Sequence, residues 1–386
     1  MAPPSAARRP AGGSAGPWPP GGRPADVGTE LLVDSPVFRT RLRDDVVSAR
    51  EHVYVQTLSF EGDDAGRELT DLLLRAACPD RRLLIDAYSL VKISDKFLYS
   101  PLRFGDHELF RERRRTGGLV RELRRAGVRV GFTNPMGPLL IRYPARNHKK
   151  LAVIDGRVAY IGGVNFSDHN FQWHDLMLRF EDSEVARALG WDFEQTWQGR
   201  NLCMTKVIPG AEIHVFRGGA NEPRFERILD LIDRAERSIF VESAYLTFPF
   251  LDRLGHASRR GVAVTVVAPR ENNFKTMDDY VAWECHRYGI DLRLYPAMTH
   301  LKAMLVDDGV LVVGSTNFDF VSYRLEQEVV ALITDPSVLA VFRAQVVEPD
   351  LAASVPAPVW SRGARGLCRR AQLQMVDGFA RIVQRL

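Results

Sequence analysis

Strand-like and helix-like runs of hydrophobic residues alternate along the first half of the chain. Continuous apolar runs with the length of buried strands occur at His52–Phe60, Arg82–Ala87 and Val128–Phe132. Between them, apolar residues recur with helical spacing at Gly66–Ala77 and around Leu119–Ala126. Because strands that alternate with helices usually form a sheet covered by those helices, the first half predicts an α/β unit.

The same order of elements returns in the second half. Strand-like runs occur at Ser238–Ala244, Val262–Val267 and Asp291–Tyr295, and helix-like runs separate them at Leu251–Ser258 and Met277–Tyr288. A recurrence over this length is too long for a solenoid repeat and is typical of a duplicated lobe. The sequence therefore predicts the α/β class, with two pseudo-symmetric αβα lobes.

We expect the first lobe to span residues 29–205 and the second residues 206–361, linked through residues 198–210. Residues 1–28 contain seven prolines and six glycines, a composition that cannot bury a core and predicts a disordered tail. A basic run at Arg111–Arg115 is interpreted as part of a solvated loop, because charge runs usually face solvent.

The last residues, 362–386, predict a basic amphipathic helix. Several arginines stand against the lone Asp377, and the apolar positions that share one helical face are Val376, Phe379, Val383 and Leu386. Such a helix can lie on an anionic bilayer. Packing on the second lobe explains the same pattern equally well.

Composition restricts the protein's surroundings. The net charge of +4, from 52 basic and 48 acidic residues, favours anionic partners only weakly. Four widely separated cysteines form no zinc or disulfide spacing, which favours a reducing compartment. The chain has no apolar run of the roughly 18 residues that a spanning helix needs, and no secretory h-region. We expect a cytoplasmic protein, peripheral at the inner face of the cell membrane.

Each half contains the same short motif, a histidine, a lysine two residues later and an aspartate five residues after the lysine. The first copy is His148, Lys150 and Asp155, and the second is His300, Lys302 and Asp307. Residues two apart on a strand project to the same face, so histidine and lysine can address one point. With only seven lysines against 45 arginines, one such match by chance is expected in about one chain in a hundred.

A glycine-rich turn ending in asparagine follows each motif, Gly162-Gly163-Val164-Asn165 and Gly314-Ser315-Thr316-Asn317. Paired motifs of this kind resemble the phospholipase D superfamily over nearly all of residues 30–386. Further details are similar to the cardiolipin synthase branch, here without transmembrane helices: Arg146-Asn147-His148, Trp173-His174-Asp175, and the arginine-rich C-terminus from Trp360. The resemblance implies one active site at the interface of two phospholipase D-type lobes.

The chemistry expected of this site is a two-step displacement at phosphorus. One imidazole attacks and forms a phosphohistidine, while the other protonates the leaving alcohol and deprotonates the incoming one. Either histidine can be the nucleophile, with His148 as the first choice. The groups expected to hold the phosphate oxygens are Lys150, Lys302, Asn165 and Asn317. The lysines would supply the positive charge, so we expect neither a metal nor a cofactor.

Each histidine needs an acceptor to orient its second nitrogen. By the family resemblance, the candidates are Glu328 for His300 and Asp175 for His148. Asp155 and Asp307 are included among the catalytic candidates, although a structural role at a strand end is equally compatible with their positions. Two further histidines, His169 and His174, lie beside aspartates but lack a recognisable metal-ligand spacing.

The function predicted is phosphatidyl transfer, with phosphatidylglycerol as donor, acceptor or both and cardiolipin as product. A phospholipase D hydrolase would pass the same intermediate to water. A nuclease would use the same residues, but the weak net charge and the lack of a basic and aromatic tract argue against nucleic acid. A catalytically silent scaffold is disfavoured because no motif residue is missing. The sequence leaves the oligomeric state open.

One departure from the family pattern concerns the stretch after Asn317. Cardiolipin synthase-like sequences commonly carry an arginine-serine pair there, whereas this chain has Val321-Ser322, with the nearest arginine at Arg324. The departure puts the acceptor preference in doubt.

Overall fold

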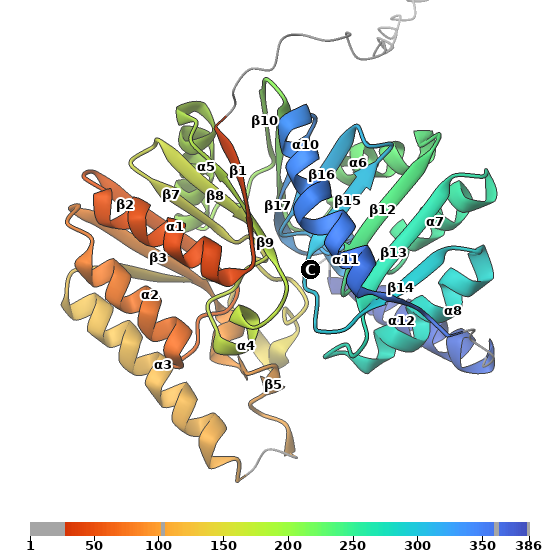
Figure 1. Cartoon of the computed structure of the whole chain (residues 1–386). Coiled ribbons are helices and arrows are strands. Elements are labelled where there is room, and N and C mark those ends of the chain that lie inside the picture. Colours follow the sequence, from red (N-terminus) through yellow and green to blue (C-terminus); the bar gives the residue numbers. More distant parts are fainter. Residues whose placement is uncertain (1–27, 102–104, 359–362, 384–386) are drawn as a thin grey trace, which may run out of the picture.

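The computed structural model describes residues 28–101, 105–358 and 363–383. It consists of two α/β lobes that lie side by side, coloured red to green and green to blue in Figure 1. The predicted two-lobed α/β fold is confirmed. The predicted tail, apart from Gly28, lies outside the described residues, as do Arg362, Trp360 and Leu386.

The first lobe is built on a seven-stranded mixed sheet with the order β1-β9-β8-β7-β2-β3-β6. Strands β2, β3 and β6 run parallel, and β7, β8, β9 and β1 continue the sheet in antiparallel pairs. The strands are β1 Thr29–Val33, β2 His52–Thr57, β3 Asp80–Asp86, β6 Arg129–Thr133, β7 Leu151–Ile154, β8 Val158–Gly162 and β9 Leu176–Phe180.

Helices cover both faces of this sheet. Figure 1 shows α1, α2 and α3 along the outer face, and α5 packs on the opposite face against β7 and β8. Smaller elements follow the sheet's carboxyl edge. The bounds are α1 Ser35–Ser48, α2 Asp64–Arg75, β4 Lys92–Ile93, β5 Lys96–Phe97, α3 His107–Arg125, α4 Asp168–Phe171 and α5 Ser183–Trp197, with single turns at Ala87–Leu90 and Pro138–Leu140.

One local prediction for the first lobe is wrong, and the link between the lobes has an added strand. The run Arg111–Arg115 lies within α3, because Leu109, Leu119 and Leu123 give this long segment an apolar face that packs inward. The predicted link at 198–210 contains a strand, β10, at Met204–Ile208, which pairs with β11 at the edge of the second sheet.

The second lobe contains a nine-stranded sheet with the order β10-β11-β17-β16-β15-β12-β13-β14-β18. Its central strands repeat the pattern of the first lobe, with β12, β13 and β14 parallel and β15, β16 and β17 antiparallel. The strands are β11 Ala211–Arg217, β12 Ser238–Ser243, β13 Ala263–Pro269, β14 Asp291–Tyr295, β15 Lys302–Val306, β16 Val310–Gly314, β17 Gln327–Ile333 and β18 Val355–Pro356.

The helices of the second lobe include the predicted C-terminal helix, α12, which packs along α8. None of the described helices is both long and apolar enough to span a bilayer. The bounds are α6 Glu222–Arg234, α7 Phe250–Arg259, α8 Lys275–Tyr288, α9 Phe320–Arg324, α10 Pro336–Phe342, α11 Glu348–Ala353 and α12 Gly363–Val383, with a π-turn at Arg343–Val347.

A single apolar core crosses the seam between the lobes. It joins Leu189 and Phe193 of α5 in the first lobe to Ile213, Val313 and Phe342 in the second. Side chains of this kind stabilise by about 1.5–3 kcal/mol each when buried, so separating the lobes would be costly. The seam is therefore a fixed part of the fold, and groups that meet there keep their geometry.

Candidate active site

The two histidines of the motifs lie at the seam, each just before the first strand of a β-hairpin. His148 precedes β7 and His300 precedes β15, and both residues are almost fully buried, with 5% and 4% of their surface exposed. Backbone bridges join each motif to the other lobe, Asn147 to Gln327 and Thr299 to His174. The seam thus repeats one arrangement twice with the roles of the lobes exchanged.

Each histidine is held by a carboxylate of the opposite lobe. His148 Nδ1 lies 3.0 Å from Glu328 Oε1, and His300 Nδ1 lies 2.7 Å from Asp175 Oδ2. The expected pairing within each lobe is wrong. The backbone bridges explain this exchange. Each bridge pairs the residue just before a histidine with the residue just before a carboxylate of the other lobe, so the histidine and that carboxylate meet across the seam.

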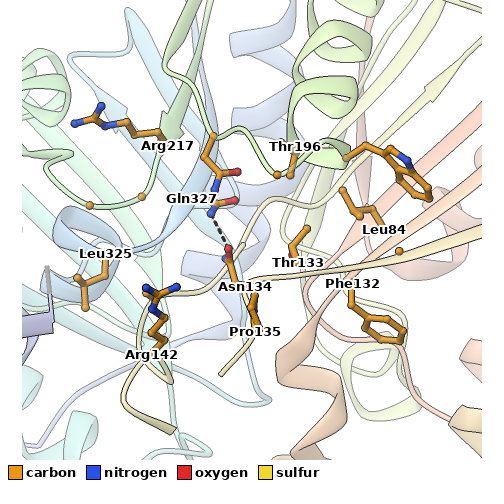
Figure 2. A pocket seen from close by; sticks show the side chains of 17 residues that line it. Leu84, Phe132, Thr133, Asn134, Pro135, Arg142, Thr196, Arg217, Leu325 and Gln327 are labelled. Atoms are coloured by element: carbon orange, nitrogen blue, oxygen red, sulfur yellow. Dashed lines mark hydrogen bonds between the residues drawn. The ribbon is translucent and has the colours of Figure 1, made fainter. Parts of the chain in front are cut away.

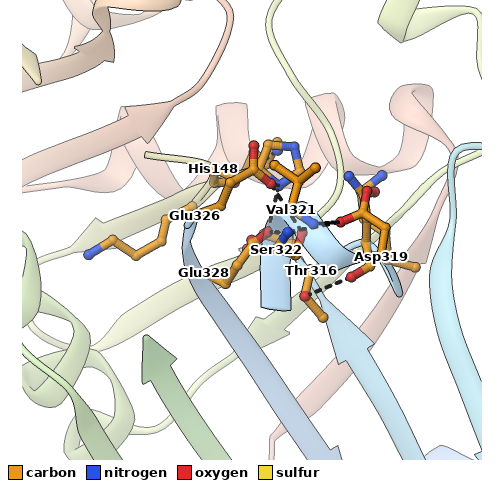
Figure 3. A network of polar contacts seen from close by, with 12 residues as sticks. His148, Thr316, Asp319, Val321, Ser322, Glu326 and Glu328 are labelled. Carbon is orange, nitrogen blue, oxygen red and sulfur yellow. Dashed lines mark hydrogen bonds and ion pairs between the residues drawn. The ribbon is translucent and has the colours of Figure 1, made fainter. Parts of the chain in front are cut away.

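Two serine hydroxyl groups hydrogen-bond to the carboxylate of Glu328 and hold it in place (Figure 3). Ser315 Oγ and Ser322 Oγ both donate to its carboxylate, the latter over 2.8 Å. Burial alone would raise the pKa of Glu328, but His148, Lys150 and the Ser315 hydroxyl together hold it below its usual value. The ionised carboxylate therefore accepts the proton on His148 Nδ1.

Asp175 is held in the equivalent way on the other side. The backbone N–H of Leu176 donates to it over 2.8 Å, and His300 and Lys302 keep its pKa low although burial opposes them. A Cβ atom on Gly163 would overlap the Asp175 carboxylate, so this turn requires glycine where the second lobe has Ser315. The two glycine-rich turns thus seat the two carboxylates.

Burial keeps both imidazoles neutral. It lowers the pKa of His148 and of His300 to about 4, even though each has a carboxylate partner. With Nδ1 donating its proton to that carboxylate, Nε2 of each ring retains its lone pair. Both rings are therefore prepared to act as nucleophile or base.

The two lysines are buried beside the histidines. Lys150 Nζ donates to the His148 carbonyl over 2.8 Å, and Lys302 Nζ donates to the His300 carbonyl over 2.6 Å. Burial, and then the charge of Lys302, lower the pKa of Lys150 to about 7, while burial lowers that of Lys302 to about 8. The charge on Lys302 disfavours a second charge on Lys150, so an anion bound between the two amino groups would stabilise both in their charged form.

The two asparagines differ in their contacts. Asn165 Nδ2 donates to Asn170 Oδ1 over 3.1 Å, so this amide is already occupied. Asn317 Oδ1 is buried and has no hydrogen-bond partner among the described residues. Phosphate binding by Asn165 and Asn317 stays a prediction.

The motif aspartates lie at the far ends of the hairpin strands and are structural. Asp155 accepts three backbone N–H groups, from Arg50 to His52, and Asp307 accepts three, from Glu236 to Ser238. Seven residues separate each from its histidine, or about 23 Å along a strand. The prediction of a catalytic role for Asp155 and Asp307 is therefore wrong, because the strand carries them away from the seam.

Three residues near the site were missed. Glu326 lies 3.9 Å from His148 Nδ1, and burial, Glu328 and Asp319 raise its pKa well above the usual value (Figure 3). The rings of Trp173 and Tyr245 lie 5.0 and 6.1 Å from the ring of His300. Glu326 was detectable in the sequence, because it stands two residues before Glu328 and shares its face.

The remaining candidates have structural partners. His174 Nδ1 lies 2.7 Å from Asp34 and Nε2 lies 3.0 Å from Asp350, and these carboxylates raise its pKa to about 10 against burial. Arg324 pairs with Asp377 of α12 and with Glu222, so it does not reach the site. Instead, the serine of the Val321-Ser322 pair supports Glu328.

Three clusters bring oxygen or nitrogen ligands within 4.8 Å of one another: His148, Glu326 and Glu328; His174, Glu242 and Asp350; Glu61, Asp63 and Glu112. In the first two, a histidine nitrogen is hydrogen-bonded to a carboxylate of the same cluster that comes from the other lobe. The absence of a metal requirement stays a prediction.

Solved structures share this fold. The phosphatidylserine synthase of Haemophilus influenzae Rd KW20 aligns with a TM-score of 0.66 and 15% identity, over 92% of this chain and 95% of that one. The polyphosphate kinase of Porphyromonas gingivalis aligns with a TM-score of 0.56 and 12% identity, over 92% of this chain and 56% of that one. At these identities the likeness establishes the two-lobed fold alone.

Curated relatives are similar in sequence. The major cardiolipin synthase ClsA of Bacillus subtilis (strain 168) is 26% identical over 344 residues, which cover 80% of this chain and 66% of that protein. Cardiolipin synthase A of Pseudomonas putida is 27% identical over 331 residues, which cover 79% of this chain and 64% of that protein. The chain thus spans slightly less than two thirds of the length of these relatives.

The family described as "Cardiolipin synthase, PLD-like domain" matches residues 42–197 and 228–348. The matched segments include both histidine-lysine motifs and both carboxylates, and they make up most of the chain. The chain therefore belongs to the cardiolipin synthase family of phospholipase D-like domains.

Proposed function

We propose that this chain is a phosphatidyltransferase of the cardiolipin synthase type, which uses phosphatidylglycerol as donor and acceptor. The observation that carries the proposal is the crossed pair of buried histidine-carboxylate contacts at the seam, with two lysines beside them. The names of the curated relatives support this lipid over other phosphodiesters.

In the first step, Nε2 of one histidine attacks the phosphorus of the donor and forms a phosphorus-nitrogen bond. The bond from phosphorus to the headgroup glycerol oxygen breaks, and the other histidine gives that oxygen a proton. We assign the attack to His148. The acid must carry a proton despite the low pKa of the free site, and a bound phosphate anion raises the pKa of both rings because opposite charge favours the cation.

In the second step, the chemistry runs in reverse with a new alcohol. His300, now neutral, removes a proton from the glycerol hydroxyl of a second phosphatidylglycerol, and that oxygen attacks phosphorus. The phosphorus-nitrogen bond to His148 breaks, and cardiolipin leaves. Throughout, Lys150 and Lys302 offset the charge on the non-bridging oxygens, and a phosphate between them restores their full protonation.

The proposal is tested with the full chain and vesicles that contain phosphatidylglycerol. We expect cardiolipin and free glycerol in equal amounts, measured by lipid mass spectrometry and a glycerol assay. Phosphatidic acid in place of cardiolipin would identify a hydrolase. Absence of both lipid products, with cleavage of single-stranded DNA that weakens steeply with salt, would replace the proposal with a nuclease.

We also propose that α12 contributes to contact with an anionic membrane at the inner face of the cell membrane. One face of the helix packs on the lobe through Leu373 and Ala380, and Arg370 pairs with Glu284 and Asp252. The opposite face is apolar and largely exposed, with more than half of each side chain in solvent, at Leu367, Met375, Val376, Phe379 and Ile382. An exposed apolar stripe on a basic helix suits a bilayer interface.

Replacing Met375 and Phe379 together with glutamate should weaken binding to anionic vesicles by about tenfold or more, because both apolar burial and charge attraction are lost. Sedimentation with phosphatidylglycerol vesicles measures the change. A matched control replaces Val37 and Val47, about half exposed on α1, with glutamate. Equal loss in both variants, or in neither, would remove α12 from the membrane contact.

A further inference from the structure

A pocket opens at the seam on the side of β17 that faces away from His148. Its volume is about 490 Å³, within the range of roughly 300–1,000 Å³ that small-molecule sites occupy. Gln327 lines it, whereas the next residue, Glu328, holds His148, and consecutive strand residues point to opposite faces. The pocket is therefore separate from the catalytic contacts, although both use the start of β17.

One end of the pocket is cationic (Figure 2). Arg142 comes from the first lobe and Arg217 from the end of β11 in the second. Neither guanidinium forms an ion pair with a carboxylate within the described ranges, and none of the residues that line the pocket is aspartate or glutamate. Two arginines without a carboxylate partner at one cavity favour an anionic ligand.

The wall between the arginines carries three buried polar atoms that lack hydrogen-bond partners: Thr133 Oγ1, Asn134 Nδ2 and Gln327 Oε1. The Gln327 side chain, only 5% exposed, donates across the seam to Asn134 Oδ1 over 3.0 Å, which fixes both amides (Figure 2). Buried polar atoms without partners are rare because each costs free energy. They are two donor atoms and one acceptor atom on residues that line the pocket.

The other end of the pocket is apolar. Figure 2 shows Leu84 and Phe132 on the side away from the arginines, and the indole of Trp197 also lines the pocket. An apolar end beside a cationic end selects a ligand that has both kinds of surface. Inorganic phosphate alone would leave this half of the pocket unfilled.

We propose that this pocket is a second binding site, specific for a phosphate ester that carries a hydroxyl group and an apolar portion. The two arginines hold the phosphate, Thr133 and Asn134 donate to its oxygens or ester oxygen, and Gln327 Oε1 accepts the hydroxyl. Glycerophosphate chemistry meets all of these requirements, either as a lipid headgroup or as a free ester. The proposal is independent of the reaction proposed for the catalytic site.

The ligand would also bear on the catalytic site through the backbone. The Gln327 N–H donates to the Arg146 carbonyl, and the Gln327 carbonyl accepts from the His148 N–H, both over 2.9 Å. A ligand bound to the Gln327 side chain would therefore contact the same residue whose backbone positions His148.

The test measures binding of three probes to the full chain carrying His148→Asn and His300→Asn, which prevents turnover. The probes are monomeric dihexanoyl phosphatidylglycerol, glycerol 3-phosphate and inorganic phosphate, followed by calorimetry and by fluorescence of Trp197 against a Trp197→Phe variant. We expect Arg142→Gln with Arg217→Gln to raise the Kd of the preferred probe at least about tenfold. The matched control is Arg111→Gln with Arg234→Gln, two exposed arginines outside the pocket.

Asn201→Asp provides a second variant that adds a negative charge to the pocket wall without changing its shape. If thermal melting shows that the double arginine variant does not fold, the Kd of the Asn201→Asp variant tests the pocket in its place. Preference for the short lipid identifies a lipid headgroup, and equal affinity for glycerol 3-phosphate identifies a free ester. Equal affinity for inorganic phosphate, or a Kd that both pocket variants leave unchanged, would overturn the proposal.

Discussion

Replacement of His148 or His300 with asparagine is expected to reduce phosphatidyl transfer by about a thousandfold or more. Asparagine has a similar polarity but can neither form the phosphorus-nitrogen bond nor move a proton, so each change removes a group that acts in both steps of the reaction. Because the reaction needs both histidines at once, loss of either one removes nearly all of the catalysis. The double variant should therefore be hardly less active than either single variant. Initial rates of cardiolipin formation measure the effect.

Exposed His286 on α8 supplies the control, because His286→Asn leaves the seam untouched and should keep full activity. Thermal melting of all variants separates loss of chemistry from loss of fold. If one single variant retained more than about a tenth of the activity, that histidine could be neither the nucleophile nor the proton-transfer group, and the proposed reaction would be excluded.

Glu328→Gln and Asp175→Asn are expected to lower turnover by about a hundredfold to ten-thousandfold, because an amide cannot stabilise a histidine that becomes positively charged. The crossed contacts add a signature that a general loss of structure would not produce. Glu328→Gln should shift the ring resonances of His148 and leave those of His300, while Asp175→Asn should do the reverse. Nitrogen-detected NMR of labelled histidine measures both.

Asp335→Asn is a suitable control, because Asp335 is a buried carboxylate of the second lobe that caps α10 through the N–H groups of Ser337 and Val338 and contacts neither histidine. It should alter neither histidine's resonances. A shift of His300 on Glu328→Gln, with His148 unmoved, would contradict the contacts across the seam.

The sequence predicted elements well wherever burial follows a simple period. Observed β14 has the predicted bounds, and the strands at 52, 82 and 238 were located to within a few residues. The motifs also identified the buried histidines and lysines, because their residue types are rare together. These features are local, so a single stretch of sequence contains the whole signal.

What the sequence could not provide were facts of tertiary placement. The partner of each histidine depends on how β9 and β17 meet the opposite lobe, and nothing near Asp175 or Glu328 encodes that. Asp155 belongs to the motif yet closes a hairpin turn, with positive φ angles of 52° at Asp155 and 56° at Gly156. Strand β10 was missed because an edge strand with one exposed face is short and weakly patterned.

Because each histidine is held by a carboxylate of the other lobe, the site is complete only when both lobes have been synthesised and folded. A half chain that folded by itself would display a histidine and a lysine but would lack the acceptor for the ring nitrogen, so it should be chemically inert. Activity would then appear only after the second domain has been synthesised and docked. A nascent or proteolysed fragment would then be unable to carry out the proposed reaction.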